Sequence, residues 1–436
     1  MPSGQVVITG LGAVSCLGLK VDDFWQGLIE GKCGIDTIKA FDPAGFPCKI
    51  AGEAEEFKIR NHVPKKIRKS TKLMCRDIEL SVLASNEAFA SSGIVTKAQD
   101  PENVTVASDR MAINFGSNVI CCDMEEIAPC IAASLKDGKF DLHKWGEDGL
   151  NALTPLWLLK YLPNMLACHV GIIHGICGPS NSITCGEAGG QLAISEAMQI
   201  IKRGDAEVAL AGGCESKVNP IMILRHTINN RCNTESNDAP EKACRPFSSD
   251  ANGSIFGEGA GMLVLEDKEF AENRGAKIQA VIAGTGESHN ICPEIEKLEP
   301  EAKGIQYAIE TALEQAEIKP EQIDLIIPHG TGIPADDLAE AKAIERVLGG
   351  AVKTATALPI MSMVSNTGAA SGALGIVTAV KAMQESKIPA AANCHELAEG
   401  CNLNIPQSVQ EKEIRYALCT SYTYGGQTAA VVIKKA

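Results

Sequence analysis

The chain contains two copies of a glycine-rich strand–turn–helix pattern. The segment GEAGGQLAI, which begins at Gly186, and the segment GAASGALGI, which begins at Gly368, share the pattern G-x-A-x-G-x-L-x-I. The helical residues that follow stay in step, so that Ala197 corresponds to Ala379. Similar units that recur in the same order indicate two related halves of one fold.

A second repeated element is an apolar strand that ends in Gly-x-Gly. It occurs as VVITGLGAVS at residues 6–15 and as KIQAVIAGTGES at residues 277–288, and we expect a tight turn after each strand. In a dinucleotide fingerprint a third glycine would follow, but Ser15 stands there, so the turn is favoured over a cofactor site. The first copy has about 90 additional residues before its glycine-rich turn, which we place mainly within residues 100–162.

Apolar strand patterns alternate with amphipathic helical patterns along the whole chain. This alternation predicts an α/β fold in which mainly parallel sheets are covered by helices. We expect an N-terminal half with the insertion at residues 1–250 and a C-terminal half at residues 251–436. The polar run TESNDAPEKA, residues 234–243, is the best boundary candidate. The expected helices are residues 76–93, 302–318 and 338–349, and a buried strand enters a polar loop at residues 323–332.

The composition excludes several classes of partner. The net charge of −14 disfavours nucleic acid or an anionic membrane surface. No run of about 18 apolar residues predicts a membrane span, and we expect no signal peptide. The 17 cysteines lack zinc-type spacing, so we expect reduced thiols in a cytoplasmic protein, mostly in the core, and no metal site.

Glu187 stands at the tip of the first glycine-rich turn, at the start of a helix. Backbone N–H groups and the helix dipole would make a cysteine at such a position a reactive thiolate. A glutamate would form a mixed anhydride with acyl groups, or it would only cap the helix and fill a cavity. His329, in PHGTGIP, ends a buried strand and is either a structural histidine or part of a site where Glu187 and Ala369 converge.

The segment PKKIRKSTK, residues 64–72, is basic in an otherwise acidic chain. It is either the solvated start of a helix or a docking site for an acidic partner. Its basic residues are Lys65, Lys66, Arg68, Lys69 and Lys72.

Motifs along nearly the whole chain resemble those of the β-ketoacyl-acyl-carrier-protein synthases, synthase II type, of the thiolase superfamily. These motifs are VVITGLGAVSCLG, FDPAGFPCKIAGE, GPSNSI, GDAEVALAGGCES, RPFSSDANGSIFGEGAGMLVLE, HGTGIPADD, SNTGAASGALG and YGGQTAAVVIKK. The resemblance implies a five-layered αβαβα fold of two duplicated halves and an obligate dimer. It also implies decarboxylative Claisen condensation of acyl groups carried on the phosphopantetheine of acyl carrier protein, without a metal or a separate cofactor.

The resemblance also exposes departures at the positions where active members have a Cys–His–His triad. The nucleophile position falls on Glu187, and Cys185 lies two residues too early, in the expected strand. The first histidine is retained as His329, whereas the second falls on Ala369 and a family lysine falls on Val364. Without a thiolate no acyl-enzyme forms, so the first half-reaction is lost.

The turn GEAGG resembles the QAGG-type turn of chain length factors, the non-nucleophilic partners of polyketide ketosynthases. The resemblance implies a non-catalytic subunit that pairs with an active ketosynthase, or with itself, through the strand at residues 180–185 and binds acyl carrier protein at the basic segment. It places Val119 at the end of the acyl tunnel and Tyr424 at the aromatic gate and former oxyanion hole. One alternative is an enzyme, a divergent synthase or a malonyl-carrier-protein decarboxylase, that uses Glu187 and His329. Another is a pure scaffold or acyl-carrier-protein-binding module.

Overall fold

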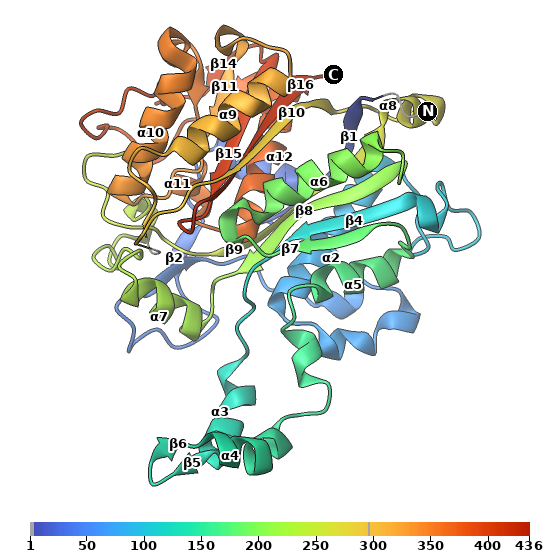
Figure 1. The fold of residues 1–436 in the computed structure, drawn as a ribbon, viewed down its shortest axis with the longest axis vertical. Coiled ribbons are helices and arrows are strands. Elements are labelled where there is room, and N and C mark those ends of the chain that lie inside the picture. Colours follow the sequence, from blue (N-terminus) through green and yellow to red (C-terminus); the bar gives the residue numbers. More distant parts are fainter. Residues whose placement is uncertain (1–3, 295–296) are drawn as a thin grey trace.

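The computed structural model describes residues 4–294 and 297–436, and ten of its strands form one large sheet with a repeated order (Figure 1). The sheet order is β12-β11-β15-β16-β10-β1-β9-β8-β4-β7. Read outward from the β1–β10 contact, the two halves match strand for strand. The strands of the first half are β1 (Val6–Val14), β9 (Glu258–Asp267), β8 (Val208–Ser216), β4 (Met111–Gly116) and β7 (Ser180–Ile183). Those of the second half are β10 (Ala280–His289), β16 (Gln427–Lys435), β15 (Tyr416–Tyr422), β11 (Leu325–Ile327) and β12 (Thr356–Ala357).

Helices divide this sheet system into five layers. Helices α6 (Gly189–Lys202) and α12 (Ser371–Glu385) contact each other and lie between the two halves of the sheet. Helices α2 (Arg76–Ser92) and α5 (Met165–His174) cover the outer face of the first half. On the second half, α9 (Lys303–Gln315) covers the sheet and α10 (Pro334–Leu348) packs beside it. The expected αβαβα thiolase-like fold is confirmed.

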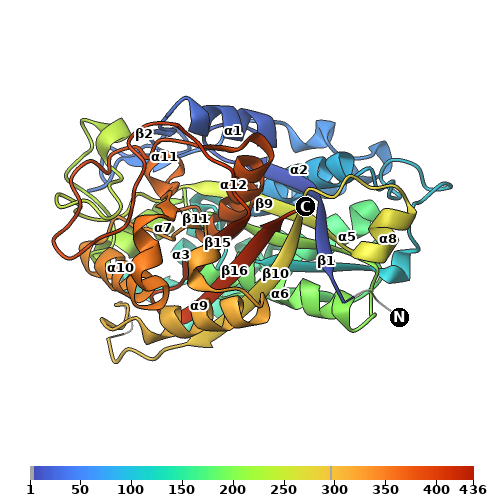
Figure 2. The same cartoon turned by 90° about the horizontal axis from the view of Figure 1, so that it is seen from above.

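The two halves meet where β1 pairs with β10, near the centre of the view in Figure 2. The Gly-x-Gly motifs lie inside these strands, so the expectation that each strand ends in a tight turn at its glycines is wrong. A Cβ at Gly10 or Gly12 would collide with backbone carbonyl oxygens of α2, and one at Gly284 or Gly286 would collide with carbonyl oxygens of α9. The repeated glycines therefore let a helix approach each strand closely.

The two glycine-rich turns form matching elbows, as the repeat predicts. The short helical turns η8 (Gly186–Ala188) and η12 (Gly368–Ala370) precede α6 and α12. Their first residues, Gly186 and Gly368, have φ values of +54° and +60°, which favour glycine. A Cβ on Gly190 or Gly213 would collide with the carbonyl oxygen of Ala369, so the elbows touch backbone to backbone.

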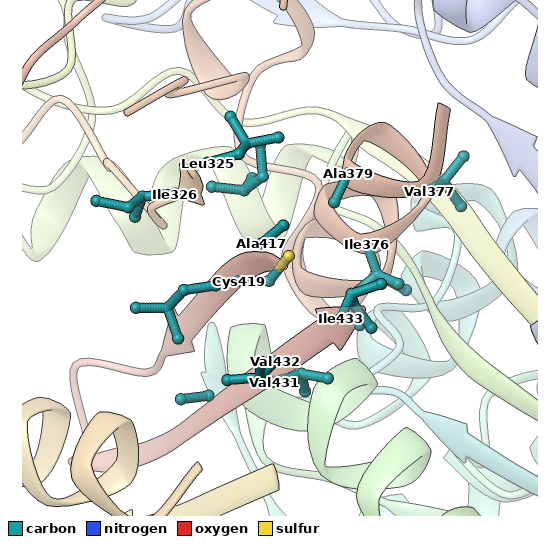
Figure 3. Packing of buried hydrophobic residues seen from close by; sticks show 14 of the residues in the cluster. Leu325, Ile326, Ile376, Val377, Ala379, Ala417, Cys419, Val431, Val432 and Ile433 are labelled. Atoms are coloured by element: carbon teal, nitrogen blue, oxygen red, sulfur yellow. The ribbon is translucent and has the colours of Figure 1, made fainter. Parts of the chain in front are cut away.

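The core of the second half is built from small and branched aliphatic side chains. Residues of α12 are buried along nearly the whole helix, and α12 contacts β11, β15 and β16 (Figure 3). With only 4% aromatic residues in the chain, close packing here depends on many small contacts. The labelled side chains are Leu325, Ile326, Ile376, Val377, Ala379, Ala417, Cys419, Val431, Val432 and Ile433.

Between β4 and β7 the chain forms an arm that projects from the body, within the region expected to hold the additional residues (Figure 1). Its elements are α3 (Met124–Ala133), β5 (Leu135–Lys136), β6 (Lys139–Phe140) and α4 (Leu142–Lys144). Several of its large apolar side chains are exposed, and Leu142 is the most exposed of them at 75%. The arm thus presents an apolar surface of the kind that partner proteins cover.

The remaining elements are short and lie at the margins of the layers. None of the helices in the described ranges is long and apolar enough to cross a bilayer. The short remaining elements are α1 (Val21–Ile29), β2 (Ile35–Thr37), β3 (Ile50–Gly52), α7 (Pro220–Ile228), α8 (Lys268–Asn273), α11 (Met361–Val364), β13 (Lys387–Ile388) and β14 (Gln410–Glu411).

The elbow contact gives a stability prediction. Gly213→Ala forces a Cβ against the carbonyl oxygen of Ala369, so we expect a loss of about 1–3 kcal/mol of unfolding free energy. Gly350→Ala is the matched control, since a Cβ at Gly350 meets nothing within 4 Å. Urea denaturation followed by circular dichroism measures both, and equal midpoints for the two variants would contradict the close elbow contact.

Candidate functional site

The tip of the first elbow is fixed by the end of β15. The hydroxyl of Ser421 donates a hydrogen bond of 2.6 Å to the carbonyl oxygen of Glu187. The backbone N–H of Ala188 donates to the hydroxyl oxygen of Thr423 at 3.3 Å. Two residues that are distant in sequence thus hold the backbone of η8, and the side chain of Glu187 points into the protein with 4% of the residue exposed.

The carboxylate of Glu187 forms a buried ion pair with Lys217, which directly follows β8. The distance from Lys217 Nζ to Glu187 Oε1 is 2.8 Å, and the side chains are 1% and 5% exposed. Burial alone would raise the pKa of Glu187, but Lys217 and then His329 outweigh it and hold this pKa far below its usual range. Burial would lower the pKa of Lys217, yet Glu187 and Glu215 raise it, so the pair is charged at neutral pH.

A second carboxylate, Glu215, completes this buried cluster. Its Oε1 lies 3.6 Å from Lys217 Nζ and accepts a hydrogen bond of 3.2 Å from the Asn118 side chain. Its Oε2 accepts a hydrogen bond of 2.8 Å from the backbone N–H of Ala369, in the second elbow. Burial raises the pKa of Glu215, and the neighbouring Glu187 charge adds to this effect against the influence of Lys217. One ammonium therefore serves two carboxylates that come from different elements.

His329 lies on the loop after β11 and is 3% exposed. Its backbone N–H donates a hydrogen bond of 2.8 Å to Glu340 in α10, and its ring packs edge-on against Tyr422 with 4.7 Å between centroids. Burial lowers the pKa of His329 to about 4, although Glu187 opposes the shift. The imidazole is therefore neutral at pH 7 and is positioned by packing and by its backbone.

The two remaining positions of the expected site carry no polar side chain. Ala369 lies in η12 and Val364 ends α11, and both are buried. His329, Val364 and Gln191 line a cavity of about 10 Å³, room for no more than about one water molecule. His329 and Val364 thus face the same small cavity, whereas Ala369 approaches the first elbow through its backbone carbonyl.

Tyr424, expected at the gate, lies in the turn between β15 and β16 and is half-buried. The Arg231 guanidinium carbon stands 4.4 Å from the centre of its ring. Arg231 also forms an ion pair of 2.7 Å with Asp336 at the start of α10. The aromatic ring is therefore held between two elements at the margin of the buried cluster.

Three other predicted features are not part of this cluster. Val119 is in the loop after β4 and is 55% exposed. Cys185 follows β7 rather than lying in it, and burial raises the pKa of its thiol, which opposes thiolate formation. In the basic segment the four lysines are exposed, whereas Arg68 is half-buried.

Lys217 and Glu215 were not among the site residues predicted from the sequence. The motif GGCES places Glu215 at the end of a buried strand, and Lys217 follows one residue beyond it. The alternation of Glu215 and Lys217 puts both side chains on one face of an extended segment. That alternation was the available signal, but it did not reveal that this face is turned inward. In the described ranges no group of three or more His, Cys, Asp or Glu side chains could hold a metal ion.

The buried ion pair gives the second prediction. Lys217→Met leaves Glu187 and Glu215 without a counter-ion, so we expect a loss of about 3–5 kcal/mol of unfolding free energy. The double variant Lys217→Met/Glu187→Gln should recover much of this loss, because one stranded charge is then removed. Lys268→Met, in an exposed pair with Glu272, is the control and should be nearly neutral. Additive losses in a double-mutant cycle, measured by chemical denaturation, would contradict coupling between the two residues.

Comparisons with known proteins identify the family of the chain. Residues 3–271 match the model of the β-ketoacyl synthase N-terminal domain, and residues 279–395 match that of the C-terminal domain. The chain is 32% identical over 436 residues to 3-oxoacyl-[acyl-carrier-protein] synthase 2 of Staphylococcus aureus strain COL, covering 99% of this chain and 98% of the relative.

Solved structures give the same result. The ishigamide ketosynthase/chain length factor superposes with a TM-score of 0.84 at 25% identity and covers 99% of both chains. A β-ketoacyl synthase from Burkholderia phymatum STM815 superposes with a TM-score of 0.86 at 26% identity over 100% of both chains. Both domain models and the full-length likeness agree, and the chain belongs to the β-ketoacyl synthase family.

Proposed function

We propose that this protein is a non-catalytic, chain length factor-like subunit of a heterodimeric β-ketoacyl synthase that acts in fatty acid or polyketide biosynthesis. The observation that carries the proposal is the ion pair of Glu187 with Lys217 at the position where the family has its nucleophile. A carboxylate cannot replace the thiolate that attacks an acyl thioester, and this carboxylate is also ionised and paired in a buried site. The likeness to a ketosynthase/chain length factor structure supports the proposal.

The loss of the other polar groups supports the same function. Val364 and Ala369 supply neither an ammonium nor an imidazole, and His329 is neutral at pH 7 with a pKa of about 4. Removal of members of a unit that acts together typically reduces turnover by orders of magnitude. Restoring a thiol at residue 187 alone therefore should not restore condensation.

The surface of the chain supports an obligate partner. Strand β7 is the outermost strand of the sheet, and it can continue the sheet into a second subunit. Obligate interfaces of this kind often bury more than about 2,000 Å² of mainly apolar surface. The arm adds exposed apolar side chains that such an interface would cover, namely Met124, Ile131, Leu135, Phe140, Leu142, Leu150, Leu156 and Leu158.

Two exposed features of the chain, Val119 and the basic segment, also fit the proposed partners. Val119 is exposed in the free subunit and lies next to Asn118, whose side chain bonds to Glu215. We place Val119 at the end of an acyl tunnel that the active partner completes. Acyl carrier protein is acidic, so it docks on the exposed lysines of the basic segment. The rest of this chain is acidic and would repel it.

The alternative function is a divergent synthase or malonyl-carrier-protein decarboxylase that uses Glu187 and His329. The full-length identity of 32% to a protein named as a synthase favours it. The two proposals differ in one respect that can be tested, namely whether Glu187 takes part in the chemistry.

The third prediction separates these functions. The purified chain alone should neither accept an acyl group from an acyl carrier protein thioester nor release CO₂ from malonyl carrier protein, as measured by intact mass and product analysis. Co-expression with a ketosynthase that has an intact Cys–His–His triad should give a 1:1 complex that makes product.

The control for this experiment is the double variant Glu187→Gln/Lys217→Met, which removes both charges of the ion pair together. A complex with this variant should keep its activity within a few-fold if the subunit is non-catalytic. A fall of about 100-fold or more, which is typical when a reacting group is lost, would favour the enzyme alternative.

The fourth prediction concerns carrier-protein docking. Charge reversal at Lys66 and Lys69 should weaken binding of acyl carrier protein to the complex by at least about ten-fold at low ionic strength. The difference should shrink above about 0.1 M salt, where the Debye length falls below about 10 Å. Lys342→Glu/Lys353→Glu, at exposed lysines of α10 and the turn after it, is the matched control. Equal affinities for both variants across a salt series would place docking on the partner subunit.

A further inference from the structure

Lys217 is turned inward although it lies just beyond the end of a strand. Its backbone N–H donates a hydrogen bond of 3.0 Å to the carbonyl oxygen of Gly257, which continues the pairing of β8 with β9 by one residue. Its side chain crosses the buried region toward the first elbow, and its ammonium meets Glu187 Oε1 at 2.8 Å. An acyl group attached to the side chain at position 187 would therefore contact the Lys217 side chain.

The stem of Lys217 is tightly enclosed. A Cβ on Gly368, in the second elbow, would approach Lys217 Cε to 2.7 Å, so the turn η12 lies directly against the stem. On another side the ammonium stands 5.3 Å from the centre of the Phe256 ring, within the range of a cation–π contact.

The charges around Lys217 keep it in this position. If the ammonium swung away, Glu187 and Glu215 would both lose their counter-ion in a buried environment, which is strongly unfavourable. Glu215 is itself fixed by the N–H of Ala369 and by Asn118. The lysine is thus held between fixed partners and does not behave as a mobile side chain.

We propose that Lys217 is a specificity-determining residue that occludes the acyl pocket of this subunit. The inference rests on the proposed function only in taking residue 187 as the former nucleophile position. It assigns the exclusion of acyl groups to Lys217, independently of the missing thiol. A variant with a thiol at position 187 is still blocked by the lysine stem.

The test uses acyl transfer to an introduced thiol on the isolated chain. In that reaction the thiolate attacks the thioester carbonyl, a new S–C bond forms, and the donor thiol leaves and takes up a proton. Three variants are compared: Glu187→Cys, Glu187→Cys/Lys217→Met and Glu187→Cys/Lys217→Ala. Methionine removes the charge and keeps most of the stem, whereas alanine removes both.

The donors are acetyl and octanoyl thioesters of N-acetylcysteamine, and peptide mapping by mass spectrometry locates the acyl group. We expect octanoyl transfer to residue 187 to be at least ten-fold faster with Lys217→Ala than with either other variant, and the gain to be smaller for acetyl. Loss of the Lys217 ammonium raises the pKa of the introduced thiol and slows its attack. Faster octanoyl transfer in the Lys217 variants therefore cannot result from a more reactive thiol.

Several results would overturn the proposal. These are equal octanoyl transfer in all three variants, equal acceleration by Lys217→Met and Lys217→Ala, or no transfer in any of them. Circular dichroism establishes that each variant is folded, and Lys217→Val replaces Lys217→Ala if the smaller side chain is not tolerated. Because no partner subunit is present, failure here leaves the heterodimer proposal standing, and failure of pairing leaves this one standing.

Discussion

The buried ammonium of Lys217 is the interaction on which the centre of this molecule depends. It is 2.8 Å from one carboxylate and 3.6 Å from another, and these carboxylates belong to different elements. In a low-dielectric interior an unpaired charge costs several kcal/mol, so each member of the cluster requires the others. Glu187 is therefore a counter-ion in this cluster, and its ion pair is an electrostatic bond between the first elbow and the residue that follows β8.

The elbow architecture depends on backbone contacts that do not involve the side chains of residues 187 and 369. Gly190 and Gly213 let the carbonyl of Ala369 approach, and Gly186 and Gly368 permit the left-handed turns of the elbows. None of these requirements concerns the chemical nature of residue 187 or 369. A fold can therefore keep its elbows, layers and sheet order while its reactive groups change.

The repeat and the elbows could be predicted from the sequence because glycine spacing and apolar periodicity indicate both of them. Glycine spacing gave a wrong prediction of tight turns at Gly10 and Gly284. In a sequence, a glycine that lets a helix pack closely against a strand cannot be distinguished from a glycine that forms a turn. Glu187 and His329 were found because they stand at the ends of recognisable elements. Lys217 was not, because only the three-dimensional packing shows that a charged residue beyond a strand end is turned inward.

The cluster also connects the closed site with the surface that a partner would cover. Glu215 binds the N–H of Ala369 on one side and the side chain of Asn118 on the other. Asn118 belongs to the loop that leads from β4 into the arm, and Tyr161 fixes the arm's base by a hydrogen bond of 2.8 Å to Glu126. The position of this loop is thus coupled to the buried charges through Asn118. The buried cluster thus links the second elbow to the base of the arm through the two hydrogen bonds of Glu215.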